Sequence, residues 1–137
     1  MREILFRAKR KDNGEWVYGD LLKNIDCIKI REREKDITRI AKSYEVIPET
    51  VGQHTGLKDK NGKMIFEGDI VTGLFNYNKI TGYIKYGSDC TFYIERNGLY
   101  GILLNNAEDW LEVIGNIYDN KELFKDLMKK ELKEKEE

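Results

Sequence analysis

The sequence predicts a mainly β protein: an N-terminal β-hairpin region, then a small barrel, then a C-terminal α-helix. Short segments with alternating apolar and polar residues run through most of the chain, and turn residues separate them at regular spacing. After residue 118 the apolar spacing becomes helical. The 137 residues can bury a core without disulfides or metals. We expect three regions, residues 1–47, 48–118 and 119–137.

The N-terminal region begins with a predicted hairpin. Residues 3–9 (EILFRAK) alternate in polarity except at Leu5, and the turn residues Asp12, Asn13 and Gly14 lead into an aromatic and β-branched segment at residues 16–18. Residues 25–30 form a further possible strand. Residues 31–36 (REREKD) are a solvated charge run, typical of a loop. Residues 44–47 are expected to be extended ahead of Pro48.

The stretch TGLKDKNGKMIFEGDIV, residues 55–71, raises the question of a phosphate or ligand loop. Asn61-Gly62 indicates a type I′ hairpin turn, which needs positive φ at both residues. No helix pattern follows Gly62-Lys63, as a phosphate-binding loop would require. We therefore interpret the stretch as the entry to the barrel. Its expected turn residues are Gly56, Asn61, Gly62, Gly68 and Asp69.

Short strands continue to residue 118. One is expected to start at residues 70–71, and others are expected at residues 80–86, 91–95, 99–104 and 111–117, with turns at 87–89, 97–98 and 105–106. About five strands of this length suit an SH3-like barrel.

The C-terminal region predicts an amphipathic helix that Asp119 or Asn120 can cap. Its last residues, KEKEE, lack apolar partners and should fray. The helix docks either on its own barrel or on another subunit. Its candidate partner-binding face consists of Leu123, Phe124, Leu127, Met128 and Leu132.

Composition narrows the possible functions. Lys and Arg number 24 against 25 Asp and Glu, so the net charge of -1 gives no global attraction to nucleic acid or to an anionic membrane. The N-terminus lacks the apolar segment of a secretion signal, and no apolar run could span a bilayer. Cys27 and Cys90 are expected to be free, buried thiols in a reducing compartment. We expect a cytoplasmic protein.

Aromatic and basic residues interleave between residues 77 and 96. Such a surface could stack bases and hold phosphates. Tyr83 and Phe92 are as well explained by core or cross-strand packing. The candidate nucleic-acid face is therefore Tyr77, Lys79, Lys85, Tyr86 and Arg96.

His54 is the only histidine, and no neighbour in sequence orients it as a base. We interpret it as a surface or half-buried ring. The acidic residues Glu49, Asp59, Glu67 and Asp69 could be read as a metal cluster, but their places beside turns favour bonds to the backbone. We expect no catalytic residue, no metal and no cofactor.

Three segments resemble the YopX family of phage and prophage proteins. They are REILFRA at residues 2–8, PETVGQHTGLKDKNGKMIFEGDIV at 48–71 and VIGNIYDNKELF at 113–124. The resemblance implies a largely β fold with an SH3-like barrel, encoded by a phage or prophage, and it carries no catalytic roles. This chain has His54, Lys121 and Lys9 where the family usually has tyrosine, proline and tryptophan.

Three functions remain as hypotheses. The first is a non-enzymatic phage accessory protein that binds a phage or host protein or associates with itself, because the sequence holds no catalytic constellation and ends in an apolar helix stripe. The second is a nucleic-acid-binding module that uses the barrel face. The third is a hydrolase or nuclease with an acidic metal site.

Overall fold

The computed structural model describes residues 4–36, 38–96, 99 and 101–136, with side chains of the last helix up to Lys129. It has two antiparallel sheets and a C-terminal helix, which confirms a mainly β chain. The chain divides into two compact units, Met1–His54 and Thr55–Glu137. The division lies within the entry segment of the expected barrel, in strand β5.

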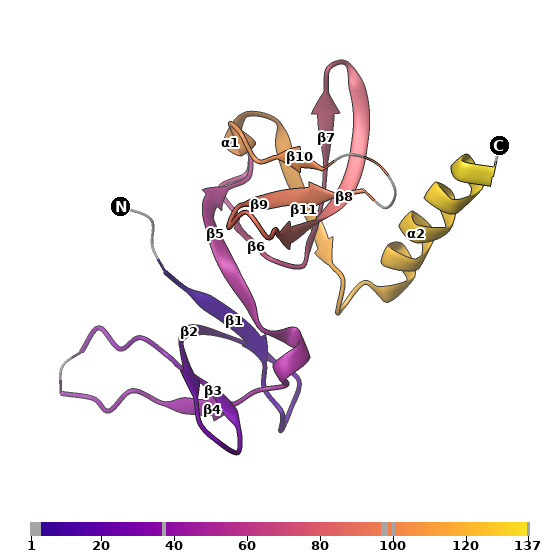
Figure 1. Cartoon of the computed structure of the whole chain (residues 1–137). Helices are drawn as coiled ribbons and strands as arrows, with labels where there is room; N and C mark the ends of the chain where they lie inside the picture. Colours follow the sequence, from indigo (N-terminus) through magenta and orange to yellow (C-terminus); the bar gives the residue numbers. More distant parts are fainter. Residues whose placement is uncertain (1–3, 37, 97–98, 100, 137) are drawn as a thin grey trace. The chain divides into compact units, whose positions relative to one another are not determined.

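The first unit contains four strands, a single 3-10 turn and the start of β5 (Figure 1). β1 pairs with β2 in register Arg7↔Tyr18, and Gly14 has φ 74° in the turn between them, so the predicted hairpin is confirmed. Ala8, Val17, Ile30 and Val46 form the buried core. The elements are β1 (Phe6–Lys9), β2 (Trp16–Lys23), β3 (Ile28–Arg31), β4 (Ser43–Glu45) and η1 (Pro48–Thr50).

β5 runs through the boundary between the units. Its first residues pair with β1, and the six-stranded sheet has the order β4-β3-β2-β1-β5-β6. The second sheet has the order β10-β9-β8-β7-β11. The elements of this part are β5 (Gly52–Lys58), β6 (Met64–Phe66), β7 (Asp69–Phe75), β8 (Asn78–Tyr86), β9 (Phe92–Glu95), β10 (Ile102–Leu103), α1 (Ala107–Trp110), β11 (Leu111–Asn116) and α2 (Lys121–Glu136).

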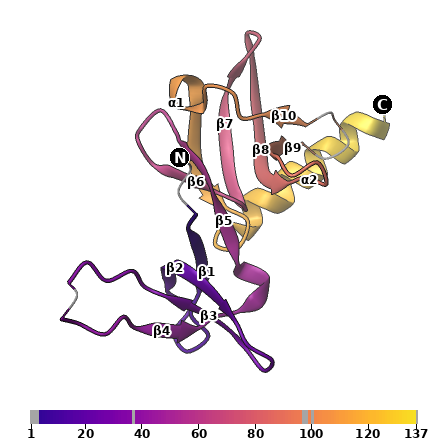
Figure 2. The same ribbon diagram turned by 60° about the vertical axis from the view of Figure 1, so that its left-hand side comes forward.

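The five-stranded sheet has two ends, β10 and β11. No pairing of β10 with β11 occurs in the part of the chain that the structure describes, so a closed barrel is not seen there. One face of the sheet buries the larger core, which includes Ile65, Val71, Ile84, Ile94 and Leu111. The β7–β8 hairpin extends beyond the other strands of this unit in both views (Figures 1 and 2).

Four details differ from the sequence prediction. Gly56, expected in a turn, lies within strand β5, where it has φ 88°. Of Asn61 and Gly62 only Gly62 has positive φ, 81°, so the turn is not type I′. Cys90 is exposed in a turn with φ 64° and Cys27 is half-buried, so the expected burial of both free thiols is wrong. The short helix α1 follows Asn106, where only a turn was expected. The turn predicted at residues 97–98 lies outside the described residues.

Candidate functional site

A buried carboxylate holds the β5–β6 hairpin. Asp59 is only 2% exposed, and its Oδ1 accepts the backbone N–H groups of Asn61 and Lys63, each at 2.9 Å. These bonds shape a turn in which Gly62 alone needs the left-handed region, which explains why the type I′ prediction failed. Its Oδ2 accepts the N–H of Val113 in β11 at 2.9 Å. Asp59 therefore has the backbone role that its place beside the turn predicted.

The environment of Asp59 also fixes its charge. Burial by itself raises the pKa of this carboxyl, but the N–H groups of Val113, Lys63 and Asn61 stabilise the carboxylate and hold its pKa below the ordinary 3.8. The group is anionic at neutral pH with its oxygens already bonded. It is consequently a structural residue and not a general acid or base.

Asp69 and His54 are buried as well. Asp69 is 1% exposed and accepts the N–H of Phe66 at 2.8 Å, next to Gly68 with φ 93°, so the predicted second turn is confirmed. His54 is 4% exposed, and its backbone N–H donates to the carbonyl of Leu5 at 2.8 Å. The imidazole is thus buried and not at the surface. Among the described residues, no group of three or more His, Cys, Asp and Glu side chains could hold a metal.

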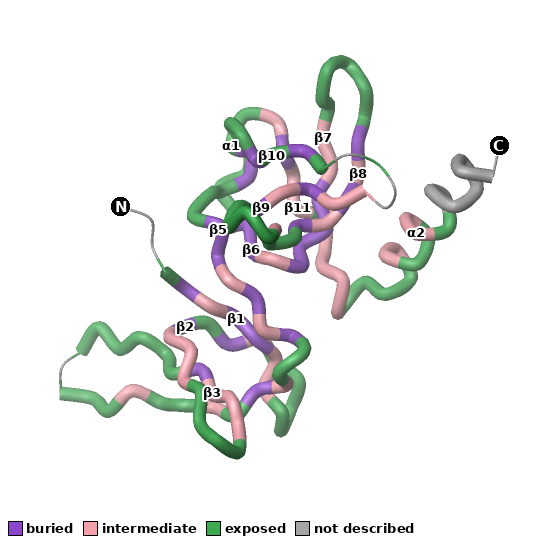
Figure 3. Tube along the Cα trace, viewed as in Figure 1, coloured by how far each residue is buried: buried purple, intermediate pink, exposed green. Residues whose placement is uncertain are grey.

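The apolar face of α2 begins on the sheet of its own unit. The rings of Phe124 and Tyr83 meet edge to face, with centroids 5.1 Å apart and planes at 83°. The turn before the helix is fixed because the side chain of Asn120 accepts the N–H of Asn116 at 3.0 Å. Along the helix, however, burial is incomplete. The four half-buried apolar residues are Leu123, Phe124, Leu127 and Met128 (Figure 3).

The fifth predicted member of this face, Leu132, lies within α2, but its side chain is outside the described residues. The described part of the face alternates with exposed charged residues such as Lys125 and Asp126. The helix is therefore amphipathic. Its apolar side contacts the sheet of its own unit through Phe124, and the apolar side chains remain partly exposed to solvent.

The predicted nucleic-acid face is not brought together in one place. Lys79 and Lys85 point to the same side of β8 but lie six residues apart, which is roughly 20 Å along a strand. Tyr77 is at the tip of the β7–β8 hairpin, whereas Tyr86 is at the far end of β8 and packs on Phe92 with centroids 4.8 Å apart. Arg96 is half-buried just after β9.

A groove that sequence reasoning missed lies beside the β7–β8 hairpin. It has a volume of about 420 Å³. Trp110 forms one wall, with its indole N–H donating to the carbonyl of Asn105 at 2.9 Å. A Cβ on Gly73 would lie 2.5 Å from the Trp110 carbonyl oxygen, so only glycine allows this close approach. The lining residues are Lys60, Thr72, Gly73, Leu74, Lys79, Asp109, Trp110 and Glu112.

The turn at the tip of the hairpin was also missed. Asn76 has φ 49° and Tyr77 has φ 68°, so both central residues of this two-residue turn are left-handed. The usual signal for such a turn is Asn-Gly, and a tyrosine in the glycine position hides it. Asn76, a residue that tolerates positive φ, between two predicted strands is the sequence signal that could have located it.

The fold is mainly β, with two antiparallel sheets and a C-terminal helix, and the carboxylates of Asp59 and Asp69 accept backbone N–H groups at its turns. A family model described as "YopX protein" matches residues 5–125. The chain therefore belongs to the YopX family, which confirms the resemblance seen in the sequence.

One solved structure is similar over nearly the whole chain. It is described as "Crystal structure of protein EF1440 from Enterococcus faecalis", with 25% identity and a TM-score of 0.56 over 90% of this chain and 99% of that one. A comparison with curated protein sequences gives no match. No helix within the described residues has the length and apolar character needed to cross a membrane.

Proposed function

We propose that this YopX family member is a non-enzymatic accessory protein, encoded by a phage or prophage. It acts in the cytoplasm of the bacterial host by binding a protein partner or by self-association. The observation that carries the proposal is the apolar face of α2. Phe124 anchors it on Tyr83, yet Leu123, Leu127 and Met128 stay partly open to solvent. Covering such a surface on association is favourable.

We also interpret the second unit as an SH3-like barrel that is open between β10 and β11. The β5–β6 hairpin extends the sheet at β11, because the N–H of Lys60 donates to the carbonyl of Leu111 at 2.9 Å and Asp59 binds Val113. Both contacts lie within residues 5–125, which the family model matches. In this interpretation the barrel is the scaffold from which α2 is presented.

The role of α2 can be tested by cutting the chain after Asp119. The expected result is a smaller assembly mass in sedimentation or light scattering, or loss of a hetero-complex. Circular dichroism and a cooperative melt establish that the truncated chain is folded. A folded truncate of unchanged assembly state would show that the helix only packs within its own subunit.

Point variants test the same face without removing the helix. Replacing Leu127 and Met128 together with glutamine should weaken association, because both side chains belong to the half-buried stripe. The matched control replaces the exposed residues Lys125 and Lys129 with glutamine. Equal association of the two double variants would contradict the proposal.

A second candidate function is nucleic-acid binding through the outer face of β8. It is supported by the charge of residues 70–86, which include two lysines and no acidic residue. The affinity for a fluorescent single-stranded oligonucleotide should fall with salt. Replacing Lys79, Lys85 and Arg96 with alanine should weaken binding, while replacing Lys58, Lys63 and Lys125 should have a smaller effect. Unchanged binding by the first triple variant would exclude this face.

A further inference from the structure

The tip of the β7–β8 hairpin carries a backbone conformation that its residue type disfavours. Tyr77 follows Asn76 in the two-residue turn and has φ 68°. In this region the Cβ of an L-residue crowds the neighbouring carbonyl, and a bulky residue there is an outlier. Glycine would meet the same turn without this cost. The conformation of the turn therefore does not explain why residue 77 is a tyrosine.

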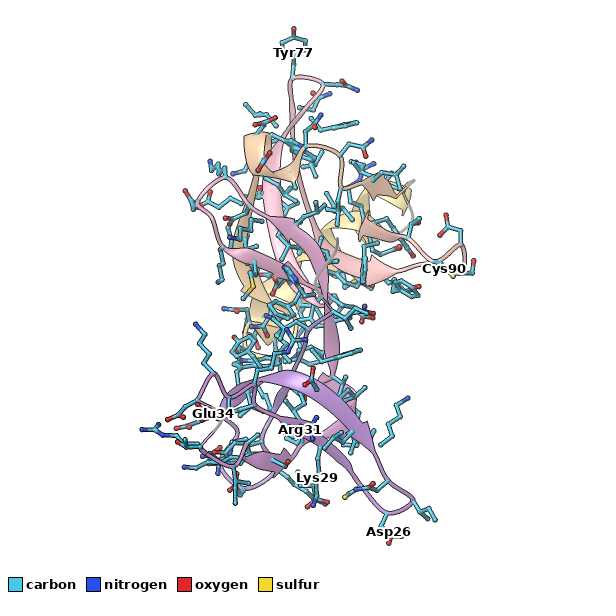
Figure 4. All side chains as sticks on the ribbon, turned by 90° about the vertical axis from the view of Figure 1, so that its left-hand side faces the viewer. Asp26, Lys29, Arg31, Glu34, Tyr77 and Cys90 are labelled. Carbon is cyan, nitrogen blue, oxygen red and sulfur yellow. The ribbon has the colours of Figure 1, made fainter. Side chains whose placement is uncertain are left out.

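The tyrosine gains no packing from its own unit. Its side chain is 101% exposed and points away from the hairpin tip (Figure 4). On the same tip Leu74 is 66% exposed and Phe75 is 39% exposed. Exposed apolar side chains gathered on a strained turn mark a binding surface.

The groove beside the tip offers a place for an aromatic side chain. Leu74 belongs to both features, because it lines the groove and stands next to the turn. Trp110 supplies an aromatic wall, and it is fixed by its bond to Asn105 and by contact with Phe75 at 5.7 Å between ring centroids. The volume of about 420 Å³ is within the usual range for ligand pockets.

Four charged side chains line the groove, namely Lys60, Lys79, Asp109 and Glu112. Lys60 and Glu112 pair with each other at 3.6 Å. Lys79 and Asp109 are exposed at the same groove, and neither forms an ion pair with any residue that the structure describes. One lining cation and one lining anion thus remain for a partner. A nucleic acid would meet both Asp109 and Glu112, which disfavours it in this groove.

We propose that the hairpin tip and the groove form a self-complementary surface through which two copies of the chain associate about a two-fold axis. Tyr77 of each copy enters the groove of the other, between Leu74 and Trp110. Lys79 of one copy then faces Asp109 of the other, and the same pair recurs by symmetry. In a two-fold interface the same surface of each copy must carry both the inserted side chain and the groove that receives it. Here the β7–β8 hairpin carries Tyr77 and also lines the groove.

This inference rests on the self-association named in the proposed function and assigns it a second surface, distinct from α2. It predicts an association that persists when the α2 stripe is altered. In the double variant Leu127→Gln with Met128→Gln, the Tyr77 dependence of the assembly mass should remain. If Tyr77→Gly no longer changes the assembly mass in that double variant, the two surfaces belong to one interface, and this inference is overturned.

The first experiment replaces Tyr77 with glycine in the full chain. The variant keeps the turn, because Asn-Gly suits it, so a folding defect is not expected. Its dissociation constant in sedimentation velocity should be at least tenfold weaker than that of the unaltered chain. The control is Ile25→Gly, which removes an apolar side chain that is 103% exposed at a turn of the first unit. Equal association of both variants, or an unaltered chain that stays monomeric at its solubility limit, would overturn the proposal.

The second experiment exchanges the two charges. Lys79→Asp alone and Asp109→Lys alone should each weaken association, because each places like charges opposite one another at the two-fold interface. The variant with both substitutions should associate again, because residues 79 and 109 of the two copies then carry opposite charges once more, with the signs exchanged. Failure of the double variant to associate better than either single variant would contradict the paired arrangement.

Discussion

The carboxylate of Asp59 accepts the backbone N–H of Val113 at 2.9 Å, a bond that closes a loop of 54 positions in the sequence. The other oxygen of the same carboxylate orders the hairpin turn. One side chain thus fixes the local turn and joins the β5–β6 hairpin to β11. Although it lies in the polar stretch KDKNGK, Asp59 is as buried as the core residues of its unit.

Replacing Asp59 with asparagine should destabilise the fold by roughly 1–3 kcal/mol, because an amide cannot accept on both sides and would turn an N–H group toward a buried donor. The free energy of unfolding from urea titration measures the effect. Asp26→Asn, at an exposed position, is the matched control. A loss no greater than that of the control would show that the carboxylate is dispensable.

The stabilisation by Asp59 should depend on pH in a defined direction. Its pKa is lowered in the folded state, against burial, by the N–H groups of Val113, Lys63 and Asn61. The contribution is therefore fully present above the unfolded pKa of 3.8 and is lost as pH falls through the lower folded pKa. The stability difference between the unaltered chain and Asp59→Asn should be constant from neutral pH to about 5 and shrink below about 4. A constant difference down to pH 2 would contradict this assignment.

Gly73→Ala should destabilise the second unit by about 1–3 kcal/mol. The added methyl carbon would lie 2.5 Å from the Trp110 carbonyl oxygen and 2.8 Å from its ring, and the backbone oxygen cannot easily move. Tryptophan fluorescence reports the change directly if Trp16 is first replaced with phenylalanine. An unaltered emission maximum and melting temperature would show that the close approach is not maintained.

Phe124→Ala should release the start of α2 from the sheet. The edge-to-face contact with Tyr83 is worth about 0.5–1.5 kcal/mol beyond the area that it buries. Amide hydrogen exchange in residues 121–129 should accelerate, while exchange in β7 and β8 should change little. Lys125→Ala, on the exposed side of the helix, serves as the control. Equal exchange in the two variants would mean that the aromatic pair does not hold the helix.

Tyr77→Gly should stabilise the isolated chain. Removing a side chain from the left-handed region relieves about 1 kcal/mol, and the exposed ring contributes no packing to offset it. The melting temperature at low concentration, where association is minimal, should therefore rise. A fall would show that the ring makes a stabilising contact in the single chain.

The sequence predicts local pairing in this protein well. The β1–β2 hairpin follows from the segments on either side of Asp12, Asn13 and Gly14, and the structure pairs these two strands antiparallel. The start of the helix after Asn120 follows from the change of period. In each case the signal lies within about ten residues, which is the range over which turn chemistry and periodicity act.

Long-range features escaped the same reasoning. The wall that Trp110 forms depends on its approach to Gly73, which is far away in sequence. Asp59 changed the type of the following turn through side-chain bonds that a dipeptide rule does not include. The helix α1 has four residues, too few for a hydrophobic period to develop. The predicted nucleic-acid face was chosen because aromatic and basic residues alternate in the sequence, but along the extended strand β8 these residues lie far apart.

The span between Asp59 and Val113 also has a consequence for synthesis of the chain on the ribosome. All strand pairs of the Met1–His54 unit are complete once Gly52 and Gln53 have paired with β1. In the other unit, Asp59 lacks its second partner and β7 lacks β11 until residues 111–116 have been made. The Met1–His54 unit can therefore fold while the chain is still growing, whereas the second unit must wait until β11 has been made.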